Sequence, residues 1–289
     1  MAGLALCLGA LFLAGCGMKS TPRPRYDFFA LTDTGRVRAN NEDAVAVHEA
    51  ARLGLLADGM GGYNAGEVAA AMAVNLVGSE LAQWLEDASD RVSMVAVRQA
   101  LLACVESANH AILAAALSNP QYLGMGTTLV VAAFRGNRLV LGHIGDSRCY
   151  RLRGGELRQI TRDHSWLQEQ IDLGLLTPAQ AAVSGLGNLV TRALGVDDAV
   201  HPEINEFAVE PQDLFILCSD GLSDMVSDTE LTELANLPLA LPEKAERMVA
   251  MANAHGGRDN ISVLLVQADP GMEAGSKKPG LVSRLLRPR

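Results

Sequence analysis

The stretch Leu53 to Gly62, LGLLADGMGG, decides the fold because it joins an apolar run to a carboxylate. The residues just before Asp58 are nearly all apolar, which predicts a short buried strand that ends on an acid. A buried charge is costly unless it is paired or binds a metal ion, and the following glycines let backbone carbonyls approach the same point. The segment by itself also fits an ordinary strand followed by an Asp-Gly turn.

An acidic residue beside Gly or Asn, next to an apolar run, recurs at four other places in the chain. These are the Glu42-Asp43 pair in VRANNEDAVAVH, Asp146 in LVLGHIGDSR, Asp220 and Asp224 in LFILCSDGLSD, and Asp259 with Asn260 in GRDN. One such acid indicates a turn, whereas their repetition indicates a gathered carboxylate site. Carboxylates and carbonyls without thiolate or imidazole neighbours favour Mg²⁺ or Mn²⁺ over Zn²⁺ or Cu²⁺.

Composition limits the classes of partner. The chain has 289 residues, of which 49% are hydrophobic, enough for a core of its own and for one domain rather than two. Its 33 acidic and 24 basic residues give a net charge of -9, which argues against nucleic acid and is compatible with attracting cations. The five cysteines lack zinc-ligand spacing and suit a reducing compartment. We therefore expect a cytoplasmic catalytic domain.

The N-terminus allows a second location. An apolar run ends in Leu13-Ala14-Gly15-Cys16 and resembles a bacterial lipoprotein signal, so a lipidated Cys16 would tether the protein to a membrane. Positive residues do not precede the run, and Met18 would serve as an ordinary start in place of Met1. We divide the chain into a leader and linker (1–25), a folded domain (26–268) and a flexible basic tail (269–289).

Hydrophobic periodicity predicts the order of the elements. Strands over 27–33, 44–48 and 53–57 precede a helix over 65–86 and a second helix capped by Ser93. A meander of antiparallel neighbours follows over 127–134, 139–144, 149–152 and 156–160. Residues 166–195 lose this regularity and predict a surface flap beside the site. Strands over 207–209, 214–218 and 261–266 then alternate with helices opened by Ser227 and Pro242.

Seven motifs in fixed order connect the chain with a known family. They are VRANNED, LLADGMGG, GMGTTLV, GHIGDSRCYR, TRDHS, LCSDGLSDMVS and GRDNISVLLV. Together they resemble the PPM family of metal-dependent serine/threonine phosphatases (protein phosphatase type 2C), bacterial branch, over residues 26–268. The resemblance implies an α+β fold, a four-layer α/β/β/α sandwich of two central antiparallel sheets flanked by helices.

The resemblance also implies a two-ion site, with Mn²⁺ or Mg²⁺ as the ions. Asp58 would bridge them, Glu42 and the Gly59 carbonyl would complete one, and Asp220 and Asp259 the other. Two such ions lower the pKa of a shared water, and the resulting hydroxide would attack the phosphorus of phosphoserine or phosphothreonine.

Further positions follow from the same resemblance. Arg38 would bind the phosphate oxygens in a bidentate fork. Asp146 would help to hold a weaker third ion, with Ser184 as the candidate ligand from the flap. Three residues would orient the ligands from behind: Asp43, Asp224 and Asn260.

One departure leaves the general acid open. Many eukaryotic members carry His where this chain has Met60, which cannot donate a proton. His164 is an alternative donor, although a packing role is the commoner one for such a histidine, and a metal-bound water is another.

We expect a phosphoprotein phosphatase that opposes a bacterial Ser/Thr kinase and acts as a monomer on phosphorylated proteins. Two alternatives use the same fold: a catalytically weak regulator that binds phosphoproteins, and a phosphatase of an anti-sigma-factor antagonist. Loss of metal ligands would favour the first, and added sensory domains would favour the second.

Overall fold

The computed structural model describes residues 25–62, 65–88, 92–182, 184 and 189–269. The leader with Cys16 and Met18, most of the basic tail and part of the flap lie outside these residues. The limits assigned to the leader, domain and tail therefore stay predictions.

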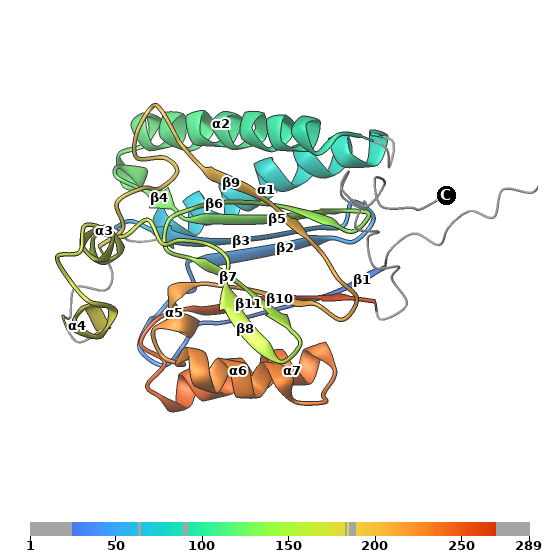
Figure 1. The fold of residues 1–289 in the computed structure, drawn as a ribbon. Helices are drawn as coiled ribbons and strands as arrows, with labels where there is room; N and C mark the ends of the chain where they lie inside the picture. The colour runs from blue at the N-terminus through green and yellow to red at the C-terminus, as the bar shows by residue number, and fades with distance from the viewer. Residues whose placement is uncertain (1–24, 63–64, 89–91, 183, 185–188, 270–289) are drawn as a thin grey trace, which may run out of the picture.

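Two antiparallel sheets form the centre of the molecule (Figure 1). Along the first sheet, the strands are β1 (Tyr26–Asp33), β11 (Ile261–Ala268), β10 (Leu214–Cys218), β7 (Arg148–Arg153) and β8 (Glu156–Gln159). Along the second, they are β2 (Asp43–His48), β3 (Leu53–Met60), β5 (Leu129–Arg135), β6 (Arg138–Ile144) and β9 (Glu203–Ala208), and the short β4 (Gly126–Thr127) pairs with β3.

Helices cover the outer face of each sheet. The helices α1 (Ala65–Asp87) and α2 (Met94–Ser118) pack on the second sheet, and α6 (Asp228–Asn236) and α7 (Leu241–Ala254) pack on the first (Figure 1). The short η1 (Pro120–Tyr122) follows α2, and α5 (Asp220–Ser223) follows β10. This arrangement confirms the four-layer α/β/β/α sandwich.

Each sheet is covered on both faces because its central strands are apolar on both faces. In β10, Leu214, Ile216 and Cys218 pack toward α6 and α7, whereas Phe215 and Leu217 enter the core between the sheets. Side chains alternate between the two faces of a strand, so a continuous apolar run buries both faces. Aromatic contacts hold the inner core, because the Phe134 ring lies 5.4 Å from that of Phe215 and 4.4 Å from that of Tyr26.

The two long helices, α1 and α2, are apolar and long enough to cross a membrane by length and composition. In this fold, α1 buries a stripe of small residues that includes Ala69, Ala70 and Ala73, and α2 buries Leu101, Val105 and Ile112. Both helices contribute to the core on the second sheet.

The predicted meander is wrong in one respect. The hairpins β5–β6 and β7–β8 form as expected, but β6 and β7 lie in different sheets. Gly145 adopts a φ of 100° where the chain leaves β6, and Asp146 and Ser147 follow it before β7 begins. Three further boundaries differ: Thr128 separates β4 from β5, β9 begins at Glu203 rather than at Phe207, and β3 continues past Asp58 to Met60. Asp58 therefore lies inside the strand and not at its end, because it still pairs with Asp43 of β2.

The flap contains two short helices, α3 (Trp166–Asp172) and α4 (Pro178–Ala182). They lie to one side of the sandwich (Figure 1). The chain returns beside the loop that precedes α3, because Ser165 forms a bridge with Val190 and the Trp166 amide donates to the Leu189 carbonyl at 2.9 Å.

Candidate metal centre

The centre begins where β2 and β3 run side by side. Asp43 and Asp58 are directly opposite each other in the ladder. The Asp58 amide donates to the Thr128 hydroxyl at 2.9 Å, and the Thr128 amide donates to the Asp58 carbonyl at 2.9 Å. Thr128, between β4 and β5, thus fixes the backbone that carries the central acid.

Glycines bring Glu42 close to this backbone. The Gly59 amide donates to the Glu42 carbonyl at 3.1 Å. A Cβ on Gly59 would lie 2.0 Å from the Gly66 carbonyl oxygen, and a Cβ on Gly66 would lie 2.3 Å from Glu42 Oε2. The start of α1 therefore packs so closely against this part of β3 that neither glycine leaves room for a side chain.

The first sheet supplies the opposing acids. Asp220 begins α5 directly after β10, and Asp259 precedes β11. The Asn260 side chain accepts from the Glu42 amide at 2.8 Å and donates to the carbonyls of Thr34 and Asn40. Asn260 therefore holds the backbone of Glu42 in place, and its role in orienting metal ligands stays a prediction.

A cavity of about 390 Å³ gathers these groups between the two sheets. Its lining contains the predicted phosphate ligand and every predicted metal ligand except the flap residue: Arg38, Glu42, Asp58, Gly59, Asp146, Asp220 and Asp259. Met60, Leu189 and Val190 also line it. The cavity therefore brings together residues from distant parts of the sequence.

The carboxylates repel one another. Burial, reinforced by Asp43, Asp220, Asp146 and Asp259, raises the pKa of Asp58 well above its usual range. Burial likewise raises the pKa of Asp220, with the charges of Asp146 and Asp224 as the next largest causes, and burial raises the pKa of Glu42.

The donor set fits divalent cations. Among the described residues, the buried Asp43 Oδ1 and Asp220 Oδ1 have no hydrogen-bond partner. A buried oxygen without a hydrogen-bond partner lowers the stability of the folded protein. Several carboxylates gathered in one cavity stay ionised together only when cations lie beside them. Carboxylates with one backbone carbonyl are the ligands of Mg²⁺ or Mn²⁺.

Two predicted supporting acids lie around the ligands. Asp43, which is opposite Asp58 in the ladder, accepts from the Ser219 hydroxyl at 2.8 Å. Asp224 lines a second cavity of about 540 Å³, which it shares with Asp146, Asp220 and the flap residues Pro178 and Ala181. The flap therefore does border the acids.

Ser184 is the flap residue that the sequence predicts as a ligand of the third ion. It is exposed, and its hydroxyl donates to the Ala181 carbonyl at 2.8 Å. Its neighbours 183 and 185–188 lie outside the described residues, so its role as a ligand stays a prediction.

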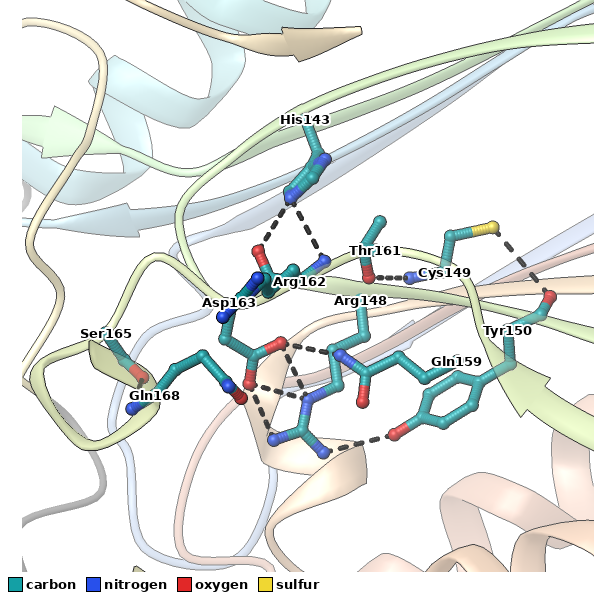
Figure 2. Close-up of polar contacts among 10 residues, drawn as sticks. All are labelled: His143, Arg148, Cys149, Tyr150, Gln159, Thr161, Arg162, Asp163, Ser165 and Gln168. Carbon is teal, nitrogen blue, oxygen red and sulfur yellow. Dashed lines mark hydrogen bonds and ion pairs between the residues drawn. The ribbon is translucent and has the colours of Figure 1, made fainter. Parts of the chain in front are cut away.

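Sequence reasoning missed the ion pair of Arg148 and Asp163, which lines the second cavity together with Asp146. Figure 2 shows the pair. Arg148 Nη2 and Asp163 Oδ2 are 2.7 Å apart, and the Asp163 side chain is 9% exposed. Gln159 donates to Asp163 at 2.7 Å, and Arg148 donates to the Tyr150 hydroxyl at 3.1 Å. Arg148 and Asp163 stand in two separate motifs, GDSR and TRDHS, and neither motif by itself indicates that they pair.

The structure does not support His164 as the general acid. Its ring is buried behind Gly145, whose amide donates to His164 Nδ1 at 3.2 Å. Burial, together with His143 and Arg192, lowers the pKa of His164 to about 4. At neutral pH, Nδ1 of such a ring carries no proton, because it accepts from the Gly145 amide.

Comparison with known proteins adds independent evidence. The family described as Protein phosphatase 2C matches residues 35–265. The serine/threonine protein phosphatase PstP of Mycobacterium tuberculosis is 44% identical over 238 residues, which are 82% of this chain and 44% of that protein. The chain thus spans less than half the length of this relative. The protein phosphatase PhpP of Streptococcus pneumoniae is 39% identical over 240 residues, 82% of this chain and 95% of that protein.

A solved structure shares the fold. The catalytic domain of PstP, crystallised with two manganese ions, has a TM-score of 0.75 and 39% identity, and the match covers 85% of this chain and 99% of that one. The two ions in that structure agree with the number of cations predicted for the acids gathered here.

Proposed function

Because the chain belongs to the protein phosphatase 2C family, we propose that it hydrolyses phosphoserine and phosphothreonine on proteins, with two Mn²⁺ or Mg²⁺ ions. The observation that carries this proposal is the single cavity that joins Arg38 to the acids of both sheets. A binding regulator without turnover would not need that complete set of acids.

Each group has a task in this reaction. Asp58, Glu42, the Gly59 carbonyl, Asp220 and Asp259 would hold the cations, which supply a nucleophile at neutral pH by lowering the pKa of water. Arg38 is half exposed at the cavity and presents a planar fork that matches phosphate oxygens. It would orient the phosphate and offset the negative charge that develops on it.

The specific partners belong to the proposal. Phosphoproteins, and a Ser/Thr kinase that modifies them, fit the predicted activity. A monomer in the cytoplasm is the simplest form, and lipidation of Cys16 would place the same domain at a membrane. An intact mass for the native protein decides between these locations, because lipidated Cys16 at the N-terminus adds a diacylglycerol group.

Hydrolysis of a phosphothreonine peptide tests the activity. We expect turnover with Mn²⁺ or Mg²⁺ and none with a chelator. The matched control is a phosphotyrosine peptide of the same sequence, which should be a poor substrate. Turnover that persists after complete metal removal would contradict the proposal.

A further inference from the structure

The turn that carries Asp146 is held by one side chain from the loop before the flap. Both backbone groups of Gly145 bond to His164: the Gly145 amide donates to Nδ1 at 3.2 Å, and the Gly145 carbonyl accepts from the His164 amide at 2.9 Å. On its other side, Gly145 touches Thr128, because a Cβ there would lie 2.6 Å from the Thr128 methyl group. Thr128 in turn holds the backbone of Asp58.

The same loop is hydrogen-bonded to the segment after the flap helices, where Leu189 and Val190 line the cavity of about 390 Å³. The His164 carbonyl accepts from the Thr191 amide at 2.9 Å, next to Val190. Nearby contacts secure the loop to β6 and β7: His143 Nε2 lies 2.8 Å from the Arg162 carbonyl, and Asp163 pairs with Arg148 (Figure 2). His164 thus stands between the turn with Asp146 and the strap formed by residues 189–191.

The hydrogen bonds fix the tautomer of the ring. Because Nδ1 accepts from an amide, the proton of neutral His164 is on Nε2. This atom is buried, has no hydrogen-bond partner among the described residues, and lies 4.0 Å from Glu203 Oε2.

His143, His164 and Glu203 also lie close enough to suggest a metal site, since their potential ligand atoms are within 4.8 Å of one another. The ring geometry opposes this reading. A metal-bound histidine donates its other N–H to an acceptor, whereas His164 Nδ1 is itself an acceptor. The rings of His143 and His164 are stacked, with centroids 4.9 Å apart and planes at 14°, so their lone pairs do not converge.

We propose that His164 is a positioning residue: its Nδ1 acceptor holds the Gly145 amide and thereby directs the Asp146 carboxylate toward a cation in the cavity. This inference rests on the proposed function in one respect, which is the identity of the cation as Mn²⁺ or Mg²⁺. It concerns metal binding, which is measured without substrate, so its failure and the failure of phosphatase activity are distinguishable.

Two substitutions separate the acceptor from the bulk of the ring. His164→Asn places an amide oxygen on Cγ, where Nδ1 is attached, and His164→Gln places its amide one carbon further away. Calorimetric titration with Mn²⁺ measures the effect of each variant. We expect Asp146→Asn to weaken Mn²⁺ binding, and His164→Gln to weaken the same binding about tenfold, as is usual for residues that orient a ligand. His164→Asn should stay within about twofold of the wild type, and His164→Gln should add nothing to Asp146→Asn, because the two act through one group.

The matched control is His110→Gln, which changes a histidine that is 64% exposed on α2. It should leave Mn²⁺ binding unchanged. Nitrogen chemical shifts of the wild-type ring at pH 7 test the tautomer directly, even if His164→Gln does not fold, and we expect the proton on Nε2. A proton on Nδ1 would overturn the proposal. So would wild-type Mn²⁺ affinity in folded His164→Gln or in folded Asp146→Asn. Equal losses of Mn²⁺ affinity in His164→Asn and His164→Gln would overturn it as well.

Discussion

Arg38 Nη2 donates a hydrogen bond of 2.7 Å to Asp259 Oδ2, so the predicted phosphate ligand and a predicted metal ligand contact each other. This contact, with burial opposing it, raises the pKa of Arg38. A cation bound by Asp259 would compete for the same carboxylate. Cation binding would thereby leave more of the guanidinium donors free for phosphate.

Replacing Arg38 tests its role at the phosphate. A charged hydrogen bond contributes about 1.5–3 kcal/mol, so Arg38→Ala should lower kcat/KM roughly 10- to 150-fold. Steady-state kinetics with an aryl phosphate and saturating Mn²⁺ measure the effect. Arg36→Ala is the control, because Arg36 is also exposed and its side chain contacts Asp33, outside the cavity. Equal kinetics for the two variants would remove Arg38 from the reaction.

A methyl group on Gly66 should disturb the metal centre. The new Cβ would lie 2.3 Å from Glu42 Oε2, so the carboxylate must move. We expect Gly66→Ala to weaken Mn²⁺ binding about 10- to 100-fold, as misplaced ligands do. Gly62→Ala is the matched control, because its Cβ would meet nothing within 4 Å. Undiminished Mn²⁺ affinity in Gly66→Ala would show that cation binding does not depend on the close packing of Gly66 against Glu42 and Gly59.

The metal-free protein should lose stability as the pH rises. Burial, with Asp163 nearby, raises the pKa of Asp146 to about 6 from an ordinary 3.8. The folded state therefore binds an extra proton between about pH 4 and 6, and the stability that this proton supplies disappears above that window. His164 has the opposite slope, because its lowered pKa removes stability as the pH falls below about 6.5.

Comparison of Asp146→Asn with the wild type cancels the contribution of His164. In a chelator, Asp146→Asn should gain at most about 3 kcal/mol relative to the wild type between pH 4 and pH 7. Thermal unfolding at both pH values measures this difference. A constant difference across the window would contradict the raised pKa.

The buried pair of Arg148 and Asp163 should contribute to stability through the cost of breaking it. Asp163→Asn leaves a largely buried guanidinium without its counter-charge, which costs about 3–5 kcal/mol. Denaturant unfolding checks this value. Asp27→Asn is the control, since its partner Arg25 is 73% exposed and such pairs contribute about 0–1 kcal/mol. Equal losses in the two variants would show that burial does not matter here.

Much of this structure was readable from the sequence. The run before Asp58 is apolar on both faces, and that pattern identified a strand between two layers. The repeated acids identified the cavity, because a charge next to a buried apolar run requires a partner. Ser93 and the Ser227 capping box located two helix starts, and turn glycines located two hairpins.

Long-range choices were not readable. The sequence around Gly145 has the glycine of a hairpin turn, yet the chain crosses to the other sheet there, and only the packing against Thr128 and His164 explains it. The pairing of Arg148 with Asp163 likewise depends on which loops meet. The secondary-structure preferences of neighbouring residues predict neither the crossing between the sheets nor this ion pair.

The most direct test counts the ions that the acids hold. Calorimetric titration of the metal-free protein with Mn²⁺ should show two tightly bound ions per chain, and Asp58→Asn should lose this binding together with turnover, while the folded state persists in circular dichroism. A folded Asp58→Asn variant that still binds two Mn²⁺ ions and still hydrolyses a phosphothreonine peptide would contradict the account.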